Sequence, residues 1–408
     1  MKFKTFAALV ALIVSAGHAM AQQGVSKTEI TLGSIQDLSG PLAGFGKQIR
    51  LGMMLRVDEL NEQGGVNGRK IKLLIEDSGY DPKKAILAAQ KLVNQDKIFM
   101  MVGHLGTAQN LAAMPVQFEK NVINFFPITA AREMYEPFNR LKYAFAATYY
   151  DQIRIATPKL VKDRSMKSVC IIYQDDDFGQ EVLRGAEAGL KTIGMDFTER
   201  TSYKRGATDF SSQVAKMKAS GCEMVVLGTI IRETIGAIGE SRKTGFNPVF
   251  LGSSAAYTDL IHKLGGKAMD GLFTTMTSQH PYLDAAEQPV RFWANKYKTK
   301  FNDDPTVFSV YGYGAIDAFI RGAQKAGTDL STDSFIRAMD TMVVPRDMFG
   351  TAEASFSPTK RLGNNFSRLS QLQEGRWKVV SEYVAFNGLR PVLQKNGTWK
   401  IGADQFKD

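Results

Sequence analysis

The residue types that most often perform catalysis are sparse in this sequence of 408 residues. Beyond the first 21 residues there are three histidines, His104, His262 and His280, and none lies at metal-ligand spacing from a second His or Cys. The nucleophile motif G-x-S-x-G and the Walker A phosphate-binding motif do not occur. We therefore predict that the protein is not an enzyme, with no catalytic residues, no metal and no cofactor.

Two further motifs have structural explanations. Residues 311–317, YGYGAID, begin like the dinucleotide motif G-x-G-x-x-G but lack its last glycine, and no clear strand precedes them. We interpret Gly312 and Gly314 as positions of close helix packing. The acidic run at 175–177 has the residue type to bind a cation, but we expect it to cap a helix that starts near Phe178, because carboxylates there satisfy free amides.

What the sequence offers instead is a series of turns rich in Gly, Ser, Thr and aromatic residues. One of them, GHLGTAQN at 103–110, follows the apolar run KIFMMV and precedes a helix-like segment. The others are DLSGPLAGFG, EDSGYDP, FFPITAARE, YQDDDFG, LGTIIRE and LGSSAAY. In open α/β sheets, ligands bind beyond the carboxyl ends of the strands. We therefore expect these turns to surround a small ligand between two lobes.

The elements that must position these turns alternate between strand-like and helix-like periods. In the first part of the chain we predict strands over 29–37, 70–77, 98–103 and 122–127 and helices over 44–65, 82–96 and 110–120. The layout begins again at residue 168, and both halves carry Phe-Gly at the first strand-to-helix turn, as Phe45-Gly46 and Phe178-Gly179. This alternation predicts an α/β fold of two Rossmann-like lobes with parallel sheets and helices on both faces.

The predicted domain division follows from this repeat. Lobe 1 comprises residues 22–148 and also 277–366, because the later helices need a sheet to cover. Lobe 2 comprises residues 149–276, and residues 367–408 return to it as paired strands followed by a C-terminal tail. We place the first crossover within AATYYDQ, residues 146–152, and expect three crossovers between the lobes.

The N-terminus has the three parts of a signal peptide. Lys2 and Lys4 form a basic region, an apolar run spans about 6–16, and Ala19-Met20-Ala21 is a cleavage motif. The apolar run is too short to cross a bilayer. We expect cleavage after Ala21 and export to the periplasm, the alternative being a buried N-terminal helix.

Charge and cysteine content restrict the partners and the chemistry further. The formal net charge is +10, but the basic residues are scattered, whereas a nucleic-acid-binding protein normally clusters them. We therefore expect no nucleic-acid partner. The two cysteines, Cys170 and Cys222, each belong to a strand-like segment. A disulfide between neighbouring strands and two buried free thiols are both open at this point.

Several segments, taken together, carry a family resemblance. They are LSGPLAGFGKQIRLGMML, NEQGGVNGRKIKL, EDSGYDPKKAILAAQKLV, MVGHLGTAQNLA, FGQEVLRG, ASGCEMVVLG and GFNPVFLG. Over about residues 30–383 the chain resembles the periplasmic solute-binding proteins of ABC importers, in particular the leucine/isoleucine/valine-binding family. The resemblance implies the type I periplasmic binding protein fold, a ligand enclosed by hinge closure, delivery to a membrane permease, and no catalysis.

The resemblance also implies a role for the turn GHLGTAQN. In the family, a small hydroxyl residue at this turn holds a ligand carboxylate together with backbone amides, and the matching residue here is Thr107, between Gly106 and Ala108. A helix N-terminus offers unpaired amides and positive potential, so a carboxylate fits there without a basic side chain. The alternative for Thr107 is a simple N-cap, and one hydroxyl can serve both roles.

The sequence departs from the amino-acid-binding members where they hold the ammonium group. The family's threonine after the fourth strand corresponds to Ala130, beside Thr129, and the acid of the second lobe corresponds to Ser254. A buried ammonium group without a carboxylate is costly. Two aromatic positions of the second lobe correspond to Phe178 and Ile230. These departures favour a small hydrophobic or aromatic carboxylate that lacks an α-amino group.

The remaining expectations concern individual side chains. Tyr149 or Tyr150 could add aromatic surface, and Arg232 is either a second contact for the anion or a solvated residue at a helix start. Phe45 and Phe178 either line the cleft or only fill the lobes. We expect the ligand-binding residues to be Phe45, Gly106, Thr107, Ala108, Ile128, Thr129, Ala130, Tyr150, Phe178, Ile230, Arg232 and Ser254.

Two alternatives keep the same fold. In one, the ligand is a branched-chain or other amino acid whose ammonium group is held by Ser253, Ser254, Tyr257 and backbone carbonyls. In the other, the protein is a ligand-sensing module that reports to a signalling partner. Such a receptor usually carries a membrane span or an output domain, and the sequence indicates neither. The favoured interpretation is a monomer with two partners, a small carboxylate and a permease.

Overall fold

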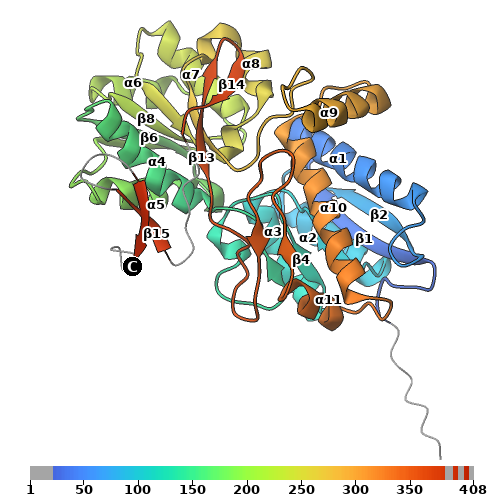
Figure 1. Ribbon diagram of the computed structural model, residues 1–408. Coiled ribbons are helices and arrows are strands. Elements are labelled where there is room, and N and C mark those ends of the chain that lie inside the picture. Colours follow the sequence, from blue (N-terminus) through green and yellow to red (C-terminus); the bar gives the residue numbers. More distant parts are fainter. Residues whose placement is uncertain (1–21, 382–388, 394–398, 404–408) are drawn as a thin grey trace, which may run out of the picture.

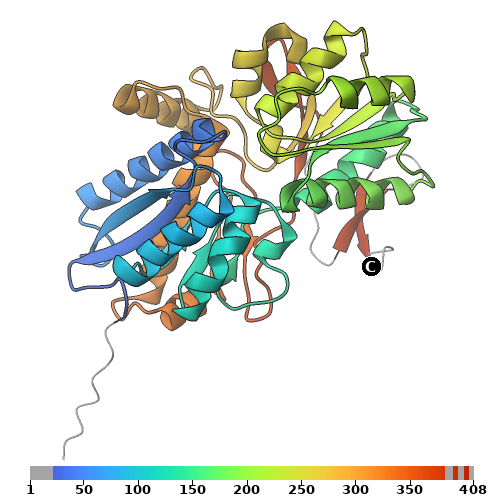
Figure 2. The ribbon, with the colours of Figure 1, turned by 180° about the vertical axis from the view of Figure 1, so that it is seen from behind.

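The computed structural model describes residues 22–381, 389–393 and 399–403. They form two lobes, each built on its own β-sheet with helices on both sides (Figure 1). The reverse view shows helices over the other face of each sheet (Figure 2). The predicted α/β fold with two lobes and parallel sheets is confirmed. The predicted signal peptide, residues 1–21, and most of the predicted tail lie outside the described residues.

Lobe 1 contains a five-stranded parallel sheet in the order β2-β1-β3-β4-β5. Its strands are β1 (Glu29–Gln36), β2 (Lys70–Asp77), β3 (Met100–Val102), β4 (Ile123–Phe125) and β5 (Lys142–Tyr143). The helices of this lobe are α1 (Ala43–Glu62), α2 (Pro82–Gln90), α3 (Thr107–Glu119), α9 (Gln288–Phe301), α10 (Val307–Ala326) and α11 (Thr332–Met339). Strands β3 and β4 are buried throughout, as expected for parallel strands covered on both faces.

Lobe 2 contains a seven-stranded sheet in the order β14-β13-β10-β9-β8-β6-β7. Its strands are β6 (Val169–Gln174), β7 (Glu199–Tyr203), β8 (Met224–Gly228), β9 (Val249–Gly252), β10 (Phe273–Met276), β13 (Arg368–Gln373) and β14 (Arg376–Val379). Its helices are α4 (Tyr149–Asp163), α5 (Asp177–Lys191), α6 (Ser211–Ala219), α7 (Arg232–Lys243) and α8 (Asp259–Gly265). The last two strands, β13 and β14, are antiparallel and close the edge next to β10.

Smaller elements complete the described residues. They are β11 (Val343–Val344), β12 (Ala354–Ser355), β15 (Leu389–Leu393), β16 (Trp399–Ala403), the π-helical turn η1 (Lys91–Gln95), and the 3-10 turns η2 (Arg132–Met134), η3 (Ser254–Ala256) and η4 (Gly266–Met269). Within the described ranges the chain passes between the lobes three times: after β5, after β10 and before β13. None of the helices found there combines the length and the apolar character that a bilayer span requires.

Helix α4 was not predicted, because its first turn falls in the segment interpreted as a crossover. The hydroxyl of Thr148 accepts a hydrogen bond from the amide of Asp151 at 3.1 Å and so starts the helix. Pro158 lies inside α4, and an internal proline usually indicates the end of a helix rather than its middle. Helix α4 packs along α5 so closely that a Cβ on Gly185 would lie 2.5 Å from the carbonyl oxygen of Tyr150. Small residues therefore fix the contact between these two helices.

Glycines also set the contact between α1 and α10. A Cβ on Gly52 would lie 2.0 Å from the carbonyl oxygen of Ser309, and one on Gly312 would lie 2.2 Å from that of Ile49. The interpretation of Gly312 as a close-packing residue is therefore confirmed. The same interpretation is wrong for Gly314, where an added Cβ would meet nothing within 4 Å.

The two cysteines are joined. Cys170 lies in β6 and Cys222 lies two residues before β8, which is the direct neighbour of β6. Their Cα atoms are 5.8 Å apart and their side chains form a disulfide. Of the two possibilities that the sequence left open, the structure has the disulfide between neighbouring strands.

We expect that replacing this disulfide in the double variant Cys170→Ala/Cys222→Ala lowers the free energy of unfolding. The bond closes a segment with a sequence separation of 52 residues, and the loss of that constraint on the unfolded chain corresponds to about 4 kcal/mol. Urea unfolding followed by circular dichroism, with and without a thiol reductant, measures the difference. A double variant as stable as the oxidised wild type would contradict the prediction, and reductant should leave the variant's transition unchanged.

Candidate functional site

A cavity lies between the lobes, where the carboxyl ends of the two sheets face each other. Lobe 1 contributes the turn after β3, the turn after β4 and the first turn of α10, and lobe 2 contributes the turns after β6, β8 and β9. The crossover segment at residues 144–149, the turns after β1, β2 and β10, and Gln152 of α4 also contribute to the wall. The prediction that the strand-end turns surround one space between two lobes therefore agrees with the position of this cavity.

The N-terminus of α3 opens directly onto the cavity. Gly106 is the N-cap, with φ of 98°, and no side chain caps the helix. Thr107 is the first helical residue and is buried, and its hydroxyl oxygen lies 2.6 Å from that of Thr129. The interpretation of Thr107 as a simple N-cap is therefore wrong. The first amides of α3 and the positive end of its dipole are oriented as an anion site requires.

The turn before α3 is held by its own side chains. The Asn110 amide nitrogen donates to the carbonyl oxygens of His104 at 2.8 Å and Gly106 at 2.7 Å. Gln109 donates to the carbonyl oxygen of Tyr80 at 2.7 Å, and a Cβ on Gly106 would lie 2.3 Å from the Gln109 side-chain oxygen. Glycine at 106 is thus required both by its backbone conformation and by this close approach. The helix start is therefore fixed without help from a ligand.

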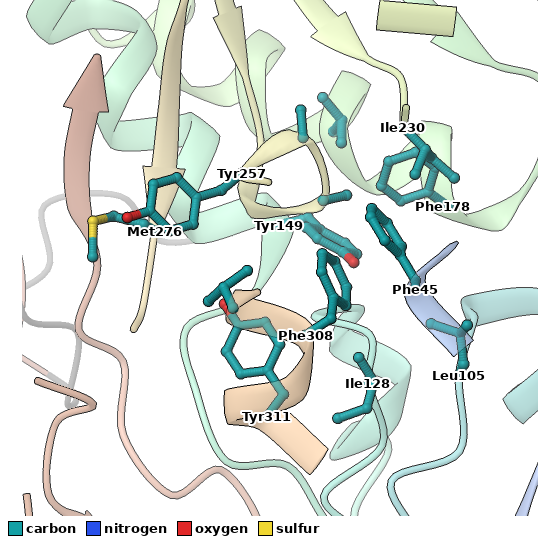
Figure 3. Packing of buried hydrophobic residues seen from close by; sticks show 14 of the residues in the cluster. Phe45, Leu105, Ile128, Tyr149, Phe178, Ile230, Tyr257, Met276, Phe308 and Tyr311 are labelled. Atoms are coloured by element: carbon teal, nitrogen blue, oxygen red, sulfur yellow. The ribbon is translucent and has the colours of Figure 1, made fainter. Parts of the chain in front are cut away.

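Aromatic rings from both lobes form the apolar part of the cavity wall (Figure 3). Phe45 of α1 stacks on Phe308 of α10, with ring centroids 3.5 Å apart. Phe178 of α5 meets Tyr149 edge to face, with centroids 5.1 Å apart. The two phenylalanines of the repeated Phe-Gly pairs thus lie at the cavity as well as in the core, and both earlier alternatives for them hold at once.

The wall of the cavity carries no formal charge. Among the described residues that line it there is no Asp, Glu, Lys, Arg or His. The polar groups include the hydroxyls of Tyr80, Thr107, Thr129, Thr148, Tyr149, Ser254, Thr277 and Tyr311. Burial raises the pKa of the Tyr149 hydroxyl above its ordinary value. Gln152 adds a buried amide, whose oxygen accepts from the Ser254 amide at 3.2 Å. All these groups are neutral near pH 7.

Most of the predicted site residues line this cavity. They are Phe45, Gly106, Thr107, Ile128, Thr129, Ala130, Phe178, Ile230 and Ser254. Ala108, Tyr150 and Arg232 do not line it. Ala108 contributes only its position in the first turn of α3, and Arg232 is exposed at the start of α7.

The tyrosine at the cavity is Tyr149 rather than Tyr150. Successive residues of a helix point in directions about 100° apart, so only one of the two can face the ligand space. The ring of Tyr150 is instead covered by the guanidinium of Arg132, 4.0 Å from the ring centroid. The choice between the two depended on the register of α4, which was not predicted.

Further lining residues were missing from the prediction. They are chiefly Tyr80, Leu105, Gln152, Thr277, Phe308 and Tyr311. Tyr80 and Gln152 belong to segments already identified as a strand-end turn and a crossover, so those segments contained the signal. Phe308 and Tyr311 begin a helix about 200 residues after the turn at 103–110. Nothing in their local pattern separates a cavity wall from a core.

Polar contacts also cross from one lobe to the other. Arg132 follows β4 and pairs with the fully buried carboxylate of Glu181 on α5 at 3.1 Å. Arg205 follows β7, pairs with Asp176 at 2.7 Å and donates to the carbonyl oxygen of Tyr80 at 3.4 Å. Asp176 is also the N-cap of α5, as predicted for the acidic run, and the described residues include no cluster of potential metal ligands. The Arg132–Glu181 pair and the hydrogen bond from Arg205 to Tyr80 therefore join the two lobes.

The chain was compared with known proteins. Residues 29–376 match the family described as periplasmic binding protein. A leucine-, isoleucine-, valine-, threonine- and alanine-binding protein from Pseudomonas aeruginosa is 23% identical over 319 residues, which are 78% of this chain and 84% of that protein.

Solved structures share the fold. A fatty acid ABC transporter substrate-binding protein from Thermomonospora curvata superimposes with a TM-score of 0.80 at 23% identity, covering 90% of this chain and 94% of that one. A solute-binding protein of an ABC transporter from R. palustris, in complex with benzoate, superimposes with a TM-score of 0.77 at 17% identity, covering 88% and 98%. At these identities the likeness establishes the two-lobed fold alone.

The buried His104 predicts a dependence of stability on pH. Burial lowers the pKa of its ring from 6.5 to about 3, and within the described residues neither ring nitrogen has a hydrogen-bond partner. The unfolded chain therefore binds this proton more readily than the folded chain. As the pH falls from about 6.5 toward 4, the free energy of unfolding should decrease, by up to about 1.4 kcal/mol per pH unit from this residue.

His104→Leu removes the titrating ring without placing another polar group in the core. Urea unfolding of wild type and variant between about pH 6.5 and 4.5 should show a shallower loss of stability in the variant. The loss of stability that remains in the variant includes a contribution from His280, whose pKa is lowered to about 4, chiefly by burial. Equal slopes for the two proteins would contradict the assignment to His104.

Proposed function

Because the chain belongs to the periplasmic binding protein family, we propose that it captures a small hydrophobic or aromatic carboxylate between its lobes and delivers it to the permease of an ABC importer. The observation that carries the choice of ligand is the neutral wall of the cavity. A ligand enclosed there loses its water, and any charge that it bears must be compensated by the groups that it meets.

A carboxylate meets such compensation at α3. Free amides at the start of the helix, the positive end of its dipole and the hydroxyl pair of Thr107 and Thr129 all favour an anion. An ammonium group needs an opposite charge, and the described lining residues include no carboxylate. An acid without an α-amino group therefore suits this wall better than an amino acid does.

The size and surface of the cavity support the same ligand class. Its volume is about 60 Å³, which favours a compact ligand. That volume suits a one-ring acid. Flat rings such as Phe45 and Phe178 pack well against an aromatic ligand, and stacked or edge-to-face pairs add about 0.5–1.5 kcal/mol each. The structural relative that holds benzoate shows that this fold accommodates such an acid.

The alternative is an amino-acid ligand, which the printed names of relatives favour. It requires hydroxyls of Ser253, Ser254 and Tyr257 to hold the ammonium group. The Ser253 hydroxyl accepts from the amide of Ala255, and the Tyr257 hydroxyl accepts from the amide of His280 at 3.1 Å. Only Ser254 of the three lines the cavity. The structure thus supplies one neutral hydroxyl where an amino-acid site needs an anion.

Membership of the family also supports a cellular location. Its relatives are periplasmic binding proteins, and export to the periplasm is the corresponding proposal for this chain. The partners that we propose are the ligand and a membrane permease, with the protein acting as a monomer. The division into lobes at residues 22–148, 149–276, 277–366 and 367–408 remains our proposal, and the sheet membership of the strands is in line with it.

Calorimetry with benzoate and leucine tests the ligand class. We expect the wild-type protein to bind benzoate and to bind leucine at least about tenfold more weakly, a difference of about 1.4 kcal/mol. In Ser254→Asp the new carboxylate repels the acid and pairs with an ammonium group, so the preference should reverse. Ser212→Asp adds the same charge at an exposed position of lobe 2 and should change neither affinity. Leucine bound tightly and benzoate not at all by the wild type would reject the proposal.

The anchoring role of Thr107 has its own test. Thr107→Val removes the hydroxyl but keeps the shape, and we expect the affinity for benzoate to fall roughly ten- to hundredfold, as for the loss of a hydrogen bond to a charged group. Thr107→Ser should keep most of the affinity. Thr234 offers a matched control, since its hydroxyl lies 2.6 Å from that of Thr229 in lobe 2 and neither residue lines the cavity. If Thr107→Val and Thr234→Val have equal effects on affinity, the hydroxyl of Thr107 does not hold the ligand.

A further inference from the structure

A second cavity adjoins the first on the side of lobe 1. It lies between α10 and the loop that connects β11 to β12, and water centres can occupy about 370 Å³ of it. Phe145 and Tyr311 line both cavities, so their rings, with centroids 5.7 Å apart, form a partition between them. The Tyr311 hydroxyl lies 3.2 Å from that of Thr277 on the side of the first cavity. The two spaces are therefore neighbouring chambers separated by a pair of side chains.

The inner wall of the second cavity is largely apolar. Phe126, Val310, Ala315 and Phe349 contribute to it along with the two partition rings. Its charged groups are engaged with other protein groups, which leaves the apolar surface as the feature that a ligand would meet. Asp317 pairs with Arg321 at 2.7 Å and with Arg56 at 2.8 Å. Asp347 accepts hydrogen bonds from the amides of Phe349 and Thr351, both at 2.9 Å.

Gly314 is the unexplained residue of this wall. It lies inside α10, where a glycine lowers stability by roughly 0.5–1 kcal/mol relative to alanine. Its neighbour Gly312 has a packing reason, because a Cβ there would lie 2.2 Å from a backbone oxygen of α1. At Gly314 an added Cβ would meet nothing within 4 Å, and this residue lines the second cavity. The missing side chain thus enlarges the cavity at the expense of helix stability.

We propose that the second cavity receives the apolar tail of the ligand, so that the ligand is a carboxylate with an extended alkyl or aryl-alkyl chain. The inference rests on the proposed function, which places the carboxylate at α3. The first cavity holds the carboxylate and the carbons next to it, and its volume of about 60 Å³ is much smaller than the 370 Å³ of the second. The chain crosses the partition once the rings of Phe145 and Tyr311 turn apart, and its end lies beside Gly314.

Calorimetry with a short acid and a long one tests this assignment. The probes are benzoate and phenylbutanoate, with octanoate as a second long acid. We expect Gly314→Phe to fill the second cavity and to weaken both long acids by about tenfold or more, while benzoate changes by less than about twofold. The variant should fold, because the new Cβ has free space and the substitution removes a glycine from a helix.

Gly239→Phe is the matched control. Gly239 lies inside α7, is half-buried like Gly314, meets nothing within 4 Å of an added Cβ, and lines neither cavity. The Gly239→Phe substitution should leave the affinities for all three acids unchanged. If Gly314→Phe affects short and long acids equally, or affects neither, the second cavity does not hold the tail. If the wild type binds none of the three acids, the proposed function fails and this inference fails with it.

The position of the end of the ligand's alkyl chain can be measured independently. Octanoate that carries bromine on its terminal carbon can be located by anomalous scattering in crystals of the complex. We expect the bromine beside Gly314. A bromine in the solvent or elsewhere between the lobes, with the carboxylate still at α3, would overturn the inference and leave the proposed function standing.

Discussion

When a charged ligand is enclosed and loses its water, groups of the site must compensate its charge. The structure around the cavity depends on this constraint. Among the described lining residues there is no charged side chain, so compensation for an anion comes from neutral donors, chiefly at the start of α3. That start must be rigid, because mobile amides would compensate less charge. The left-handed backbone of Gly106 and the side chain of Asn110 provide this rigidity through contacts within the turn itself.

The rest of the fold brings apolar surface to the same place. Parallel strands carry their carboxyl ends to one edge of each sheet, and the three passages of the chain between the lobes set the two edges opposite each other. The rings of Phe45 and Phe178 line the cavity, and they belong to equivalent turns of the two lobes. Because the Arg132–Glu181 pair and the hydrogen bond from Arg205 to Tyr80 cross between the lobes, a change in the separation of the lobes would also change these polar contacts.

The sequence predicts the parts of the site that depend on local pattern. Thr107, Phe45 and Phe178 lie in strand-end turns, and the alternation of strands and helices is enough to place such turns at one edge of a sheet. The sequence does not predict the parts of the site that depend on the register of a helix or on contacts between residues far apart in the chain. Tyr150 was chosen over Tyr149 because α4 was not recognised. Tyr311 was missed because the turns of lobe 1 that it joins at the cavity lie far from it in the sequence. The pairing of the two cysteines likewise needed the order of the strands.

The amino-acid-binding relatives match this chain over most of its length, whereas the choice of ligand depends on the side chains that line the cavity. A relative whose name records amino-acid binding aligns with most of the chain, yet lining positions such as Ala130 and Ser254 carry no charge here. Since the backbone scaffold does not depend on those side chains, the same two lobes can enclose ligands with different head groups. Ligand length is controlled separately, by the rings of Phe145 and Tyr311 and by the space at Gly314. In the proposed complex the carboxylate meets α3 and the end of the tail meets Gly314 of α10, while Phe308 and Tyr311 of α10 line the first cavity as well.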